Sequence, residues 1–313
     1  MALHFVLEEV NSGAFLVVVL SGVTVEYAAP SGQTSLRTNL ATLAVRDDRA
    51  VFCFSRFDEA HLAAAMGLRV PVVHYGARYI YAAMAVARAA GAEGHEHGDQ
   101  HQGGSQMQQV AADSRAQGGR QILMSRIKHA LAKTGAEVVW MLLQDLTHNL
   151  VPYRLVTYEE QYEYWLLADF IAAVFVPWNW ELITYLEWYA IGLPIFVPGP
   201  DMMVPLILHN LRTYPDVQKN QTYWMNLREE WAHGDSVQRP EATKDHSMWV
   251  AAWYAQTDYM RAPHVRSFAH WADLLVQILG CDFRAWAEAR RAANERAHRQ
   301  ATSYYLTLAS RAL

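Results

Sequence analysis

Short, continuous apolar runs alternate with segments of helical spacing along much of this chain, and this alternation constrains the fold more than any other feature. The runs "IAAVFVP" (171–177) and "LPIFVP" (193–198) flank a short aromatic stretch and then a predicted helix that carries Glu187. Gly192, followed by Pro194, is expected to close this helix. Strands that are apolar throughout are typical of parallel sheets buried on both faces. The sequence therefore predicts an α/β fold with helices covering parallel sheets.

The same rhythm occurs on both sides of a polar stretch. Before it, we predict a strand in "RAVFCFS" (49–55), a helix in "DEAHLAAAMG" (58–67) with Asp58 near its N-cap, and a strand in "VPVVHYG" (70–76). After it, "RQILMSRIKHALAKTG" (120–135) has the apolar spacing of a helix, and "AEVVWMLL" (136–143) is predicted to be a strand.

These two arrays predict two Rossmann-like domains that face a cleft, of which the first is short. All eleven tryptophans follow residue 139, which indicates two regions of different character. The polar stretch between them is rich in Gly and Gln and is predicted to be a flexible linker or loop. The predicted division is an N-terminal domain (1–92), a linker (93–119), a C-terminal domain (120–282) and a helical segment (283–313).

Composition excludes several classes of protein. Hydrophobic residues make up 52% of the 313 residues and charged residues 18%, as in a globular protein with a large core. The formal charge of −5 gives no reason to expect nucleic-acid binding. The apolar run "FLVVVLSGV" (15–23) is too short to span a bilayer, so we predict a cytoplasmic or otherwise soluble protein, with a secretory-pathway origin left open. The mildly basic face of 283–313 allows contact with a membrane surface but does not indicate it.

The joint after the strand 171–177 is the most informative candidate site. In open α/β sheets, ligands bind beyond the carboxyl ends of the strands, and the start of the following helix suits a diphosphate. Glu187 lies on that helix, where its carboxylate either binds the hydroxyl groups of a ribose or serves as an exposed or Arg-paired helix residue. Thr184 and Ile191 share its face at helical spacing. The residues predicted to point toward the sheet instead are Leu186, Ala190 and Leu193. Trp178, next to Pro177, is interpreted equally as a ligand contact or as a core side chain.

The segment 153–198 resembles the nucleotide-sugar half of glycosyltransferases of the GT-B type. The resemblance rests on Ala168-Asp169 at a helix end, Pro177 after an apolar strand, and Glu187 followed by Gly192 and Pro194. It implies a nucleotide-diphosphate sugar as donor substrate, no metal or other cofactor, and an unknown hydroxyl acceptor. By the same resemblance Glu187 binds the ribose, and the remaining candidate donor contacts are Thr184, Pro177, Trp178, Asn179, Glu181 and Arg154.

Departures from the family pattern lead to two functional hypotheses. An earlier Glu that contacts the donor sugar in that family is here Asn179, with Glu181 two residues out of register, and no Gly-rich phosphate loop is visible. The first hypothesis is an active glycosyltransferase in which His74 and Arg78, at the end of a predicted strand, serve the acceptor side. The alternative is a catalytically inactive GT-B-like module that binds nucleotide sugars or acts in assembly.

A histidine-rich sequence in the linker offers a third kind of site. "HEHGDQH" (95–101) places imidazoles at spacings that a Zn²⁺ or Ni²⁺ ion accepts, but a linker gives no rigid frame to orient them. We therefore predict no metal site. The sequence motifs of phosphate-loop ATPases, standard dinucleotide dehydrogenases, α/β-hydrolases and zinc ribbons do not occur in the chain.

Overall fold

The structure is a computed structural model in which the chain forms two compact units. Unit 1 comprises Met1–Tyr75, Pro215–Arg261 and Arg296–Leu313, and unit 2 comprises Gly76–Tyr214 and Ala262–Glu295. The predicted boundaries at 92/93 and 119/120 lie outside the described residues and stay predictions. The residues that the structure describes are 16–20, 49–53, 55–66, 69–72, 121–124, 145, 153–157, 167, 170–177, 182–213 and 246–312.

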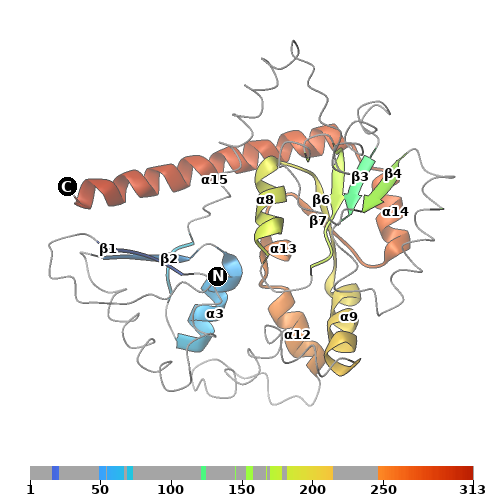
Figure 1. Ribbon diagram of the computed structural model, residues 1–313, viewed down its shortest axis with the longest axis horizontal. Coiled ribbons are helices and arrows are strands. Elements are labelled where there is room, and N and C mark those ends of the chain that lie inside the picture. The colour runs from blue at the N-terminus through green and yellow to red at the C-terminus, as the bar shows by residue number, and fades with distance from the viewer. Residues whose placement is uncertain are drawn as a thin grey trace, which may run out of the picture. The chain divides into compact units, whose positions relative to one another are not determined.

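Unit 2 contains a five-stranded sheet in which every pair of neighbouring strands is parallel. The order across the sheet is β4-β3-β5-β6-β7 (Figure 1). This confirms the predicted α/β class with a parallel sheet. The strands are β3 (Gln121–Met124), β4 (Arg154–Thr157), β5 (Ala172–Val174), β6 (Ile195–Pro198) and β7 (Val265–Phe268).

Helices cover this sheet, as the continuous apolar strands require. Every residue of β3, β5 and β6 is buried, so both faces of these strands are covered. Helix α8 and helix α14 lie on opposite sides of the strands in Figure 1. The described helices of this unit are α8 (Ile183–Ile191), α9 (Pro200–Thr213), α14 (Trp271–Leu279) and the first part of α15 (Phe283–Ala312).

Strand β3, which lies inside the sheet, corrects one prediction. We expected a helix over 120–135, but Gln121–Met124 form a strand between β4 and β5. The four buried residues of β3 stand at the start of a longer segment with helical spacing. So short an apolar run fits a strand as well as a helix, so the sequence does not distinguish the two. Strand β7 was not predicted at all, since this edge strand has two exposed residues and no apolar run.

Unit 1 contains a smaller parallel arrangement. Strand β1 (Leu16–Leu20) pairs with β2 (Arg49–Cys53), and Cys53 forms a further parallel bridge with Val72. Helix α3 (Arg56–Met66) connects β2 to that bridge, so the predicted first strand and the helix after it are confirmed. The described part of the predicted strand 70–76 forms a single bridge, at Val72. The unit also includes α12 (His246–Tyr254), α13 (Asp258–Arg261) and the part of α15 from Arg296 onward. Residues 283–313 were predicted as a helical segment, and α15 is a single helix.

The start of α3 differs from the prediction in an informative way. The helix begins at Arg56, two residues before Asp58, and the carboxylate of Asp258 accepts the backbone N–H of Arg56 at 3.2 Å. Asp258 is only 6% exposed. Nearby, the ring of Phe57 meets that of Trp253 edge-on, with centroids 5.6 Å apart. The capping carboxylate therefore comes from a residue 202 positions later in the chain.

Replacing Asp258 by Ala should lower the free energy of unfolding by about 1–2 kcal/mol, because the start of α3 loses its acceptor. Urea unfolding followed by circular dichroism measures this change. Asp258→Asn is the matched variant, since its amide oxygen still accepts the Arg56 N–H, and it should lose clearly less. Equal losses in the two variants would show that the hydrogen bond to α3 is not what Asp258 contributes.

Among the described residues, no helix combines the length and the apolar character needed to cross a lipid bilayer.

Candidate functional site

The strand order of unit 2 places a topological switch point between β3 and β5. Numbered by their order in the sequence, the five strands are arranged 2-1-3-4-5 across the sheet. The chain therefore goes from β3 to β4 on one side of it, and then crosses to β5 on the other side and continues outward to β6 and β7. In sheets of this order, ligands bind at the carboxyl ends of the strands beside the switch point. The stretch after β5, which the sequence singled out, begins at this switch point.

Three strand ends line this edge of the sheet. Val174 lies opposite Phe196, and Phe196 lies opposite Arg266. The strands are parallel and about 4.8 Å apart, so residues the same number of positions beyond these paired residues lie side by side at the same height along the strand direction. The residues three positions further along the chain are Pro177, Gly199 and Ala269. The chain therefore leaves β5, β6 and β7 at the same height along the strand direction.

The amino end of α8 has no side-chain cap from its own N-cap residue. Its N-cap is Leu182, whose side chain makes no capping hydrogen bond, and its first turn has no acidic residue. The carbonyl of Leu182 accepts the N–H groups of Tyr185 and Leu186, as in any first helical turn. The earlier N–H groups and the positive end of the helix dipole suit an anion. Pro177 is buried and Thr184 is half-buried in this region.

Glu187 lies in the second turn of α8 and is nearly buried. It is 8% exposed, and its carboxylate is not a free group. Thr184 and Ile191, which we expected on the same face, are both half-buried. A ribose at Glu187 would have to reach a side chain with little open surface.

The side of α8 that packs on the sheet differs from our expectation. We expected Leu186, Ala190 and Leu193 to point toward the strands, but Leu186 is only half-buried. Instead, the rings of Tyr185 and Trp188 meet Phe175, directly after β5, with centroids 5.4 and 5.3 Å away. Large rings fill the space between helix and strand end better than Leu and Ala do. Trp188 is 1% exposed and therefore belongs to the core.

The carboxyl end of α8 is held by side chains from α15. Asn294 donates to the carbonyls of Tyr189 and Ala190 at 2.7 and 3.2 Å, and Arg290 donates to the carbonyl of Tyr189 at 3.2 Å. Gly192 ends the helix in the left-handed conformation, with φ of 85°. A Cβ there would lie 2.8 Å from the Arg291 side chain, so α15 packs closely at this point. The carboxyl end of α8 is thus fixed by side chains, whereas the side chain of its N-cap residue Leu182 makes no capping hydrogen bond.

Arg154 does not reach this edge. It is the first residue of β4 and pairs with Gln121, while Ile122 pairs with Ala172. Arg154 is therefore level with the start of β5, six positions before Pro177. At about 3.3 Å per residue, the two are separated by about 20 Å along the strand direction. The structure puts Arg154 at the amino end of the sheet, away from the proposed diphosphate.

Several predicted site residues lie outside the described residues. The donor-side candidates among them are Trp178, Asn179 and Glu181, and the acceptor-side candidates are His74 and Arg78. The histidine sequence 95–101 falls in the same category. The described residues contain no group of three or more His, Cys, Asp or Glu side chains that could hold a metal ion.

Polar residues that sequence reasoning missed lie at the ends of β6 and β7. Asp201 is exposed in the first turn of α9. His270 is the N-cap of α14, and its Nδ1 accepts the N–H of Asp273 at 3.0 Å. The N–H of Ala269 donates to Asp273 and lowers the pKa of this carboxyl, with a further contribution from Gln277. The spacing of His270 and Asp273, three residues apart before an apolar run, is the signal that could have located this helix start.

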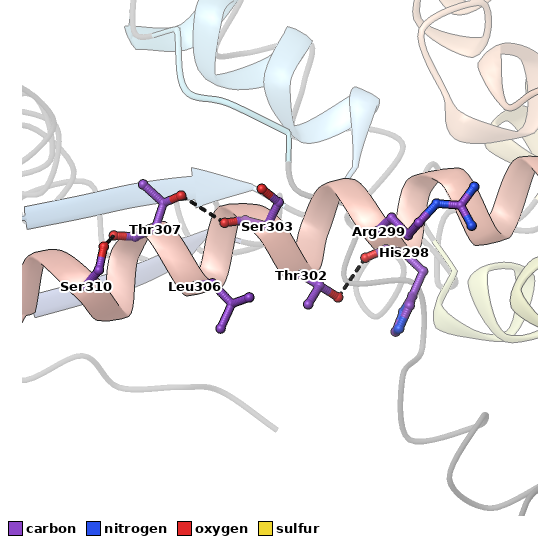
Figure 2. Close-up of a pocket in the computed structure, with 7 residues that line it drawn as sticks. All are labelled: His298, Arg299, Thr302, Ser303, Leu306, Thr307 and Ser310. Carbon is purple, nitrogen blue, oxygen red and sulfur yellow. Dashed lines mark hydrogen bonds between the residues drawn. The ribbon is translucent and has the colours of Figure 1, made fainter.

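A hollow follows the exposed face of α15 within unit 1 (Figure 2). It runs from His298 to Ser310 on one helix. The hydroxyls of Thr302 and Thr307 donate to carbonyls one turn earlier in the same helix. These hydroxyls are thus already used within the helix, which gives no arrangement of groups for a reaction.

Comparison with protein-family models, with curated proteins and with solved structures gave no match for this chain.

Proposed function

We propose that the protein is a glycosyltransferase that binds a nucleotide-diphosphate sugar at the carboxyl edge of the sheet in unit 2. The observation that carries the proposal is the amino end of α8, which has no side-chain cap from Leu182 and no acidic residue in its first turn and follows β5 beside the switch point of a 2-1-3-4-5 sheet. The proposal includes a second Rossmann-like domain in unit 1, with a cleft between the two for donor and acceptor. The parallel pair β1–β2 with α3 is consistent with that domain type.

The diphosphate would lie at the start of α8, where N–H groups and the helix dipole favour negative charge. The segment that leads into the helix, with Trp178, Asn179 and Glu181, would line the donor, and Thr184 would face it from the first turn. Glu187 would accept hydrogen bonds from the ribose hydroxyls after exchanging its present partner. Arg154 has no part in this arrangement, because it lies at the other end of the sheet.

Sugar transfer requires a base and a stabilised leaving group. The acceptor oxygen forms a bond to the anomeric carbon of the sugar while the bond from that carbon to the phosphate oxygen breaks. His74 would take the proton of the acceptor hydroxyl in an inverting reaction, with Arg78 beside it on the acceptor side. The N–H groups at the start of α8 would stabilise the nucleoside diphosphate that leaves.

Calorimetry with UDP-glucose, GDP-mannose and ADP-glucose tests the donor site. We expect saturable binding of one of them, and Glu187→Gln should weaken it about tenfold or more, since hydrogen bonds to a charged group contribute about 1.5–3 kcal/mol. The matched control is Glu288→Gln, which removes an exposed carboxylate bonded to Arg284 on α15 and should leave affinity unchanged. If none of the three donors binds, or if Glu187→Gln binds as tightly as the unchanged protein, the proposal fails.

A second candidate function is nucleotide-sugar binding without transfer, as a sensor or assembly module. It is favoured by the placement of Arg154 at the other end of the sheet. Without Arg154, the described residues directly after β5, β6 and β7 include no Lys or Arg that could contact a diphosphate. A leaving diphosphate usually needs such charges. In this case we expect binding of the nucleotide sugar without release of nucleoside diphosphate over hours of incubation. Release that disappears in Glu187→Gln would exclude this second function and support the first.

A further inference from the structure

We draw no further inference here: the strongest candidate, the hollow along the exposed face of helix α15 between His298 and Ser310, carries none because nothing in the described part of the structure shows what covers it.

Discussion

Replacing Arg290 by Met should lower the free energy of unfolding by about 3 kcal/mol, because its guanidinium stabilises the carboxyl end of α8. Arg290 is 0% exposed, donates to the carbonyl of Tyr189, and stacks on the ring of Tyr189 at 4.1 Å. A helix leaves its last carbonyls without intrahelical partners and carries partial negative charge there. Met retains much of the apolar stem of Arg but supplies neither the charge nor the donors.

Arg284→Met provides the matched control on the same helix. The Arg284 side chain is 88% exposed and bonded to Glu288 at 3.1 Å, and such surface pairs contribute little to stability. Its loss should change the free energy of unfolding by less than about 0.5 kcal/mol. Urea unfolding measures both variants, and hydrogen exchange of α8 locates the effect. Equal midpoints for the two variants would contradict the role of Arg290.

The second large effect is expected from Trp188→Ala, which should cost about 3–5 kcal/mol of unfolding free energy. Trp188 is 1% exposed, and its ring meets Phe175 edge-on at an interplanar angle of 80°. Removing the indole leaves a cavity between α8 and the end of β5 that rigid neighbours cannot fill. Because this contact positions α8 against the sheet, the variant should also lower the affinity for any ligand that binds at the start of α8.

Two further variants separate the cavity from the mere loss of a tryptophan. Trp188→Phe keeps an aromatic ring against Phe175 and should lose much less stability than the Ala variant. Val276→Ala shortens a side chain that is 69% exposed on α14 and should stay within about 0.5 kcal/mol of the unchanged protein. The packing role of Trp188 is wrong if Trp188→Ala and Val276→Ala have the same urea midpoint.

The sequence alone predicted the elements whose pattern is complete within a few residues. "IAAVFVP" and "LPIFVP" are apolar throughout, and β5 and β6 lie within them with a helix between them, as predicted. Gly192, followed by Pro194, was expected to close that helix, and its left-handed conformation does so. These features depend on local sterics and on the burial of short runs, which neighbouring residues determine.

Ambiguous or long-range features were decided by the tertiary structure. Strand β3 begins a segment with helical spacing, and only pairing with β4 and β5 on either side makes it a strand. Likewise, Asp58 has a suitable position in the sequence for capping α3, but Asp258 does so from 202 residues away. Such contacts depend on which segments meet in space, and no local pattern records that.

The candidate site divides in the same way. The sequence was sufficient to place a helix after a buried strand, because both signals are local to residues 171–192. It could not show that Arg154 stands at the opposite end of the sheet from Pro177, since the direction and register of β4 depend on its pairing with β3. It also could not show that α15 supplies Arg290 and Asn294 to the other end of α8, about 100 residues along the chain. Local pattern determined which elements form, and packing between distant segments determined which side chains meet.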